Sequence, residues 1–234
     1  MTAPIGLGIF IWELPLCENG NISNIIAKTK RCNISWLAIH MDPITTDLVK
    51  TLHASGLYIA AWKYTIPGDD FITHADLCRR SGCDAILPDC EIEWETVNGG
   101  SKASDFAKAL RDKVGTDCFL GNCGAWQWPD KHPLYPDHTF GKYWDAGMPE
   151  RYWTMFPPSV SAKEALDESD KQWADPINRG AYKTLIPIGS AFDGSAQGGQ
   201  SLTITDLEMF LNRQSTCALW SWQHISPDIW TYLE

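Results

Sequence analysis

The sequence lacks the features that mark membrane proteins and nucleic-acid-binding proteins. It contains no run of about 18 apolar residues, so we expect no membrane-spanning helix. The opening MTAPIGLGIFIW has no basic region before its apolar stretch, so we expect no cleaved secretion signal and synthesis in the cytoplasm. The formal net charge is −10 and no stretch is rich in Lys or Arg, which excludes nucleic acid and anionic membranes as expected partners.

Patterns for metals, cofactors and disulfides are missing as well. The six His are scattered, with no clustered pair on the first predicted strand, so we expect no catalytic metal and no cofactor. The eight Cys fit no recognisable zinc pattern. A chain of 234 residues can build a core without disulfide staples, and no export signal is visible. We therefore predict reduced, mostly buried thiols.

Aromatic residues, by contrast, are abundant. The chain has 12 Trp, 7 Tyr and 8 Phe. Large planar side chains fill cores, and they also stack on sugar rings, so we expect about half of them to be core residues. The remainder indicate a protein that handles carbohydrate.

Apolar runs alternate with helical patterns along the whole chain. The predicted strands are 5–12, 36–41, 57–64, 84–92, 118–126, 151–156, 184–192 and 217–223. Predicted helices between them start near Thr46, at a Thr73–Asp76 capping box, at Ser101 or Ser104, and at a Thr205–Glu208 capping box. Strand–helix units repeated about eight times predict a single (β/α)8 barrel spanning residues 1–234.

Long loops are expected over the C-terminal face of this barrel, chiefly from residues 127–183, the least regular region. The alternative is an open doubly wound sheet. That fold usually carries a glycine-rich phosphate turn after its first strand, and WELPLCENGN at this place lacks the spacing.

The most unusual stretch is LPDCEIEWE at residues 87–95. Its acidic residues are two apart and alternate with apolar ones, so a strand would place them all on one face. If Leu87 faces the barrel interior, the same parity turns Asp89, Glu91 and Glu93 inward and progressively nearer the mouth. Active sites of such barrels lie at the carboxyl ends of the strands.

Neighbouring carboxyl groups raise one another's proton affinity, so one of them can stay protonated near neutral pH and donate to a leaving group. We predict Glu91 as the general acid and Asp89 as the residue that holds and polarises it. Glu93 is an alternative acid one step further out. The structural alternative is a solvated strand end whose acids pair with Lys or Arg.

Several motifs resemble sugar-cleaving barrels. PDCE at 88–91 of the fourth strand resembles the D-x-E signature of glycoside hydrolase family 25 lysozymes and family 18 chitinases. GLYIAAWKYTIP (56–67) is similar to the third strand of the lysozyme family, and LWSWQHIS (219–226) to the end of its last barrel strand. GMPERYWTMF (147–156) resembles the sixth-strand Met…Tyr pattern of chitinase-like barrels. Phe10 stands where family 25 has an Asp, so we expect a diverged relative of both families.

The resemblance implies hydrolysis of an amino-sugar polymer, with peptidoglycan the first choice and chitin-like glycans the second. The 2-acetamido group of the sugar would attack its own anomeric carbon while Glu91 protonates the leaving oxygen. Asp89 would orient the acetamide, and Tyr152 would stabilise the cyclic intermediate. Such enzymes need no second acid. If one is used, Asp193 or Glu150 is the candidate.

Other residues at predicted strand ends are expected to bind the substrate. Trp12, Trp62 and Trp222 would form the floor and walls under the sugar. The remaining candidates are Glu13, His40, Lys63, Asn122, Glu150 and Gln223. The glycine-rich segment 189–201 is expected to be a flexible lid or substrate loop.

The expected partner is therefore a polysaccharide, and the expected state is a monomer. A protein made in the cytoplasm and then released to a cell wall, as phage lysins are, would fit these features. Two other functions stay open. One is a carbohydrate-binding barrel without catalysis, and the other is a barrel enzyme whose acids hold a divalent ion.

Overall fold

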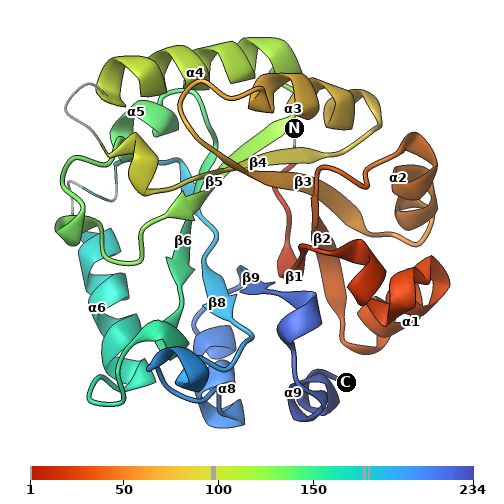
Figure 1. The fold of residues 1–234 in the computed structure, drawn as a ribbon, viewed down its shortest axis with the longest axis vertical. Helices are drawn as coiled ribbons and strands as arrows, with labels where there is room; N and C mark the ends of the chain where they lie inside the picture. Colours follow the sequence, from red (N-terminus) through yellow and green to blue (C-terminus); the bar gives the residue numbers. More distant parts are fainter. Residues whose placement is uncertain (1, 96–98, 176–177, 179) are drawn as a thin grey trace.

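The computed structural model describes residues 2–95, 99–175, 178 and 180–234. Parallel strands close into a barrel with eight strand positions, surrounded by helices (Figure 1). The strands are β1 (Gly6–Ile11), β2 (Ile34–His40), β3 (Tyr58–Thr65), β4 (Ala85–Cys90), β5 (Phe119–Ala125), β6 (Ala146–Arg151), β7 (Thr184–Leu185), β8 (Ile188–Ser190) and β9 (Thr216–Trp220). The two short strands β7 and β8 share the seventh position. Pairing of β9 with β1 and of β5 with β6 closes the cylinder, which confirms the predicted (β/α)8 barrel and excludes the open sheet.

The helices lie outside the strands. They are α1 (Ile22–Arg31), α2 (Thr46–His53), α3 (Phe71–Arg80), α4 (Gly99–Val114), α5 (Asp137–Gly141), α6 (Ala162–Ala174), α8 (Ile204–Asn212) and α9 (Pro227–Leu233). Short 3-10 turns follow several strands, among them η3 (Ile92–Trp94), η5 (Trp153–Met155), η6 (Ser195–Gln197) and η7 (Trp222–His224). No helix in the described ranges is long and apolar enough to cross a bilayer.

Strand alternation divides the buried residues into two layers. One parity fills the barrel interior with Phe10, Trp36, Ala38, Ala60, Trp62, Ala85, Leu87, Phe119, Cys123, Ala146, Met148, Ile186, Ile188 and Ala218. The other parity packs against the helices, as Ile9 and Leu37 do. The interior is thus a packed core rather than a pore, so a substrate can bind only above it, at the strand ends. All eight Cys are buried and unbridged, which confirms the predicted thiols.

The sixth strand is the largest error in the predicted elements. It was expected at 151–156, whereas β6 runs Ala146–Arg151 and the residues after it form the turn η5. The true strand contains Gly147, Pro149 and Glu150, which have low strand propensity, while the aromatic residues after it favour strand. Residues 127–183 also hold more regular structure than expected, since α5, β6 and α6 all fall inside them.

Three helix starts were predicted slightly too late in the sequence. The side chain of Thr45 caps α2, one residue before the predicted start. Thr203, rather than Thr205, accepts the capping hydrogen bond of α8. The helix α3 already begins at Phe71, so the predicted capping box at 73–76 lies inside it. Short polar residues near these termini offer several competing caps, and tertiary packing selects among them.

Candidate active site

Three carboxyl groups converge at the carboxyl ends of β4 and β6. Asp89 lies in β4, Glu91 follows that strand directly, and Glu150 lies in β6. One oxygen from each lies within 4.8 Å of the other two. The strand between them, β5, contributes Gly124, whose missing side chain leaves the necessary room. A Cβ there would sit 2.8 Å from Asp89 Oδ1.

Burial and mutual repulsion change the proton affinity of all three groups. Asp89 is 7% exposed, and burial, followed by the charges of Glu91 and Glu93, raises its pKa to about 8. Burial and Glu93 also raise the pKa of Glu91. Burial, Asp89 and Glu91 raise the pKa of Glu150 well above its usual range. The group therefore holds protons near neutral pH and titrates as one coupled unit.

One oxygen of this group is poised for a ligand. Within the described ranges, no donor reaches Asp89 Oδ1, although the atom is buried. An unpaired buried acceptor costs about 1–3 kcal/mol, so it is expected to be satisfied when substrate or water is bound. The same three residues are also the group, among those described, whose geometry could hold a metal ion.

Glu93 departs from the expected row. The strand β4 ends at Cys90, and the turn η3 then breaks the alternation that should have carried Glu93 inward. The Glu93 side chain is exposed and lies outside the three-carboxyl group. Together with burial, its hydrogen bond raises the pKa of Tyr64. The predicted inward position is wrong for Glu93 and holds for Asp89 and Glu91.

Tyr152 lies where the sequence placed it, although the strand before it was misassigned. Its hydroxyl donates to Glu150 Oε1 over 3.5 Å, a long hydrogen bond. Its ring packs edge-on against Phe192 at 5.6 Å between centroids. Asp193, by contrast, is exposed and accepts a hydrogen bond of 2.8 Å from the backbone of Ser195. Asp193 is therefore not brought to the three carboxyl groups.

A cluster of aromatic rings covers the interior core beside these acids. Trp62 lies 4.8 Å from Trp220 and 5.7 Å from Phe10, and Trp12 lies 6.4 Å from Trp220. Trp12 is 48% exposed, so one face of the cluster is open to a ligand. The sequence pointed to Trp12 and Trp62 but missed Trp220.

The predicted position of Trp222 in this floor is wrong. The residue is 3% exposed and belongs to the layer between strands and helices. Its ring packs 4.8 Å from Trp230 of α9, with the ammonium of Lys28 5.8 Å away. Because β9 ends at Trp220 and the turn η7 follows, alternation does not continue to Trp222.

Two further predicted contacts point away from the mouth. Lys63 follows the inward Trp62 and therefore faces α3, where its Nζ lies 3.5 Å from Nδ1 of His74. Asn122 is fully buried, and its amide donates to the hydroxyls of Tyr135 and Tyr182. Both placements as substrate-binding residues are wrong because these positions have outward parity.

The remaining candidates border the opposite side of the mouth. His40 is half-buried, with its ring 5.1 Å from that of Trp62 and its Nδ1 3.4 Å from Asp42. Glu13 and Trp12 are exposed and line a hollow of about 450 Å³ that also includes His40. Gln223 accepts a hydrogen bond of 3.5 Å from the Trp12 backbone. These residues stay candidates for substrate binding.

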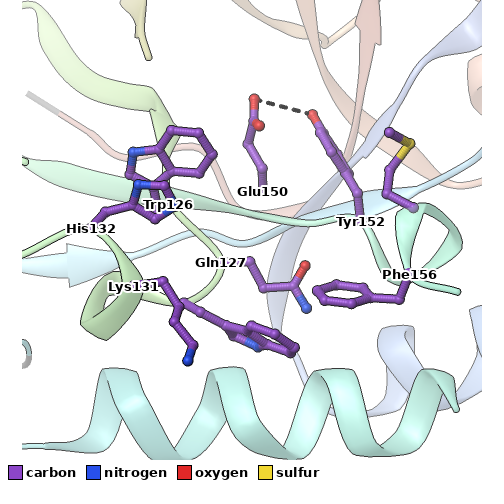
Figure 2. Close-up of a pocket in the computed structure, with 9 residues that line it drawn as sticks. Trp126, Gln127, Lys131, His132, Glu150, Tyr152 and Phe156 are labelled. Atoms are coloured by element: carbon purple, nitrogen blue, oxygen red, sulfur yellow. Dashed lines mark hydrogen bonds between the residues drawn. The ribbon is translucent and has the colours of Figure 1, made fainter. Parts of the chain in front are cut away.

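A cavity of about 340 Å³, called cavity 1 here, opens beside Glu150 and Tyr152. It is lined by Trp126, Gln127, Trp128, Lys131, His132, Glu150, Tyr152, Met155 and Phe156. Figure 2 shows the Glu150 and Tyr152 side chains side by side on one margin, with Trp126 and His132 stacked next to them. The aromatic wall was not predicted, although Trp126 ends a predicted strand and Trp128 lies two residues beyond it.

The stacked pair in that wall is held firmly. The rings of Trp126 and His132 are parallel within 3° at 3.7 Å between centroids. Glu95 holds His132 in place, with 2.8 Å between its Oε2 and Nδ1 of the imidazole. On the other side of the cavity, Trp128 lies 4.4 Å from Phe156. The cavity is thus a rigid aromatic chamber with a carboxyl group on its margin.

Comparisons with known proteins identify the fold. No family model matches the chain, and no curated protein matches it. A chitinase from Bacteroides thetaiotaomicron superposes with a TM-score of 0.61 at 10% identity, covering 99% of this chain and 96% of that one. A GH2 beta-galacturonidase from Eisenbergiella tayi gives 0.65 at 10% identity, covering 98% of this chain and 50% of that one. A protein assigned as a deoxyribose-phosphate aldolase from Toxoplasma gondii gives 0.60 at 11%, covering 97% and 92%.

These similarities show that the chain shares the TIM-barrel fold with these proteins, and they do not show a particular family or activity. Identities of 10–11% are compatible with many unrelated activities on the same fold. The chitinase and the galacturonidase belong to the predicted glycosidase class, but the fold of the aldolase is about as similar to this chain as theirs. The chemistry therefore has to be argued from the site itself.

Proposed function

We propose that the protein is a glycoside hydrolase acting on an amino-sugar polymer, with peptidoglycan the first choice of substrate. The observation that carries the proposal is the group of three carboxyls at the barrel mouth, whose raised pKa values keep protons available near neutral pH. Partly open aromatic rings lie on both sides of this group, as expected of a site that holds sugar rings.

Glu91 is the general acid in this proposal. It is half-buried and directly follows β4, so it is more accessible than Asp89 and can reach a glycosidic oxygen. As the bond from the anomeric carbon to that oxygen breaks, the oxygen keeps the electron pair and takes the Glu91 proton. Water later adds to the anomeric carbon and returns a proton to Glu91, which restores the acid.

Asp89 positions the substrate's own nucleophile. Its unpartnered Oδ1 can accept a hydrogen bond from the acetamide N–H, which turns the acetamide oxygen toward the anomeric carbon. That oxygen forms the new bond as the leaving group departs, and Tyr152 can hydrogen-bond the cyclic intermediate. The two successive displacements at one carbon predict retention of the anomeric configuration.

Glu150 is better suited to hydrogen bonding than to nucleophilic attack. Its oxygen lies within 4.8 Å of Glu91, close to the roughly 5–5.5 Å that separates the carboxyls of retaining enzymes. However, burial and the neighbouring acids raise the pKa of Glu150 well above its usual range, which favours its protonated form. A protonated carboxyl group donates to a sugar oxygen but is a poor nucleophile.

A divalent-cation enzyme is the second candidate. The convergence of three acid oxygens within 4.8 Å specifically favours it, since a hard cation would neutralise their repulsion as effectively as protons do. Chelator separates the two functions, because it would abolish the activity of a metal enzyme and leave proton-based glycosidase chemistry unchanged.

Aldolase chemistry through a Schiff base receives less support from the site. Such a mechanism needs a lysine amine that is desolvated and directed at the substrate. Lys63, the lysine of β3, instead faces α3 and contacts His74. Lys131, on the margin of cavity 1, is exposed.

Product analysis after incubation with purified peptidoglycan and with N-acetylglucosamine oligomers tests the proposal. Glu91→Gln should lower turnover by roughly 100- to 10,000-fold with an unchanged fold. Glu208→Gln is the matched control, because it makes the same chemical change at an exposed acid of α8, outside the carboxyl group. Full activity of Glu91→Gln would refute the assignment. Tight glycan binding by the wild type without any product would favour a binding barrel instead.

A further inference from the structure

We infer that the substrate chain lies across two cavities that meet over Tyr152 and Met155, so that the protein cleaves glycans internally rather than from an end. This inference rests on the proposed function and extends it to the mode of attack. It names a second binding region, on the β8–β9 side of the mouth, for the sugar units on the far side of the scissile bond.

The second region, cavity 2, has a volume of about 310 Å³. It is lined by Met155, Phe192, Asp193, Gln197, Trp220 and His224. The side chains of Phe192 and Trp220 are partly exposed and offer ring surface. Asp193, Gln197 and His224 are exposed and carry the carboxylate, amide and imidazole groups that bind sugar hydroxyls. Each cavity falls at the lower end of the roughly 300–1,000 Å³ found for small-ligand sites.

The two cavities are joined rather than separate. Met155 lines both of them, and its side chain is 55% exposed. Below it, Tyr152 of cavity 1 packs edge-on against Phe192 of cavity 2 at 5.6 Å. The two cavities are therefore separated only by a ridge that consists of the Met155 side chain and the rings of Tyr152 and Phe192. A polymer can cross such a ridge, because Met adapts its shape and its sulfur packs well against apolar faces.

The position of the reactive groups relative to the ridge defines the cleavage site. Glu150 belongs to the lining of cavity 1 and receives the hydrogen bond of Tyr152, as Figure 2 shows. Glu91 and Asp89 place an oxygen within 4.8 Å of that same Glu150. The scissile bond thus lies beside the ridge, with sugar units in cavity 1 on one side and in cavity 2 on the other.

The chemistry of the linings fits glycan better than an apolar ligand. Cavity 1 presents Trp126, Trp128, Tyr152 and Phe156, all partly exposed, and ring faces of this kind stack on the apolar faces of sugars. Cavity 2 mixes two rings with three hydrogen-bonding groups, which suits the alternation of C–H faces and hydroxyls around a pyranose. The glycine-rich segment 189–201 supplies Asp193 and Gln197 to this lining.

Affinity measurements on the Glu91→Gln protein test the inference, because that protein should bind without turnover. The probes are the dimer and the hexamer of β-1,4-linked N-acetylglucosamine. Gln197→Trp, added to the Glu91→Gln protein, places a large ring in cavity 2 from an exposed turn. It should weaken binding of the hexamer roughly tenfold and should affect binding of the dimer much less. Trp128→Ala, in cavity 1, should weaken both. Leu77→Trp is the control, since it adds the same ring to the exposed face of α3, and should change neither.

Equal effects of Gln197→Trp on dimer and hexamer, or no effect on either, would overturn the inference. With the active protein, early products from a long glycan should be a spread of lengths, and release of dimers alone from the first time point would also overturn it. Failure of the proposed function has a different signature. In that case the wild type yields no product from any glycan, while the two affinities still report whether the chain crosses both cavities.

Discussion

Neutralising Asp89 should make the protein more stable at neutral pH while impairing its activity. Asp89 is buried among acids, and its pKa is raised from 3.8 to about 8. The folded protein therefore keeps a proton that the unfolded chain releases. Because the unfolded state binds fewer protons, stability falls as pH rises from near 4 toward 8. Asp89→Asn removes this liability, and the new amide can donate to Glu91 or Glu150.

The magnitude follows from the window between the two pKa values. Each pH unit inside the window costs about 1.4 kcal/mol for one group. Between about pH 5 and pH 7 the stability of the wild type should therefore fall, relative to Asp89→Asn, by about 3 kcal/mol. For a chain of this length that difference corresponds to roughly 10 °C in Tm.

Guanidinium unfolding followed by tryptophan fluorescence, at these two pH values, measures the difference directly. Asp105→Asn is the control, because it removes the same formal charge from an exposed side chain of α4, outside the carboxyl group. Its stability should follow that of the wild type at both pH values. Parallel pH dependence for Asp89→Asn and the wild type would refute the reasoning, since it would mean that Asp89 ionises as easily in the folded protein as in the unfolded chain.

Four further outcomes are expected. Because burial and Glu93 raise the pKa of Glu91, kcat should stay high as the pH rises above about 4, the ordinary pKa of a carboxyl group, and should fall only at a higher pH. A fall in kcat already near pH 4 would exclude Glu91 as the acid. Trp12→Ala should raise KM with little change in Tm, whereas Trp222→Ala should cost about 3–5 kcal/mol in a denaturation curve, and the reverse pattern would contradict their placement. Gly124→Ala should cost about 3 kcal/mol or more, because its Cβ would lie 2.3 Å from a backbone oxygen of β4; wild-type stability would show that the strands can separate without penalty. A thiol reagent should modify the eight buried Cys only as fast as the protein opens, so rapid labelling of the native protein would contradict their burial.

The barrel could be predicted because its signal is spread over the whole chain. Apolar strands and amphipathic helices recur about eight times, as a parallel sheet with crossover helices requires, and local errors do not remove the pattern. The inward direction of Asp89 followed from the same parity, since Leu87 and Asp89 lie in one uninterrupted strand. Glu91, one step beyond the strand end, still lies beside Asp89 in the folded protein.

The parts that could not be predicted lie where a strand ends. Glu93 and Trp222 were both placed by extending alternation into residues that fold as 3-10 turns, and there the period of two no longer applies. Glu150 was considered only as an optional second acid and a substrate-binding residue, because a misplaced sixth strand hid its inward position beside Asp89. Trp126 was the last residue of a predicted strand and Trp128 lay in the region expected to be loop, so the aromatic wall of cavity 1 was not predicted.

The local pattern of residues was enough to predict the order and type of most elements and the alternation of side chains within the strands. It also predicted that the thiols are reduced. Closure of the barrel decided which acids meet. It brought an oxygen of Glu150, which lies 61 positions after Asp89, to within 4.8 Å of an Asp89 oxygen and shielded both carboxyl groups from water. Proton affinity depends on that burial and proximity, which no stretch of sequence contains. Only the tertiary structure could therefore turn a row of acids into a group that holds a proton near neutral pH.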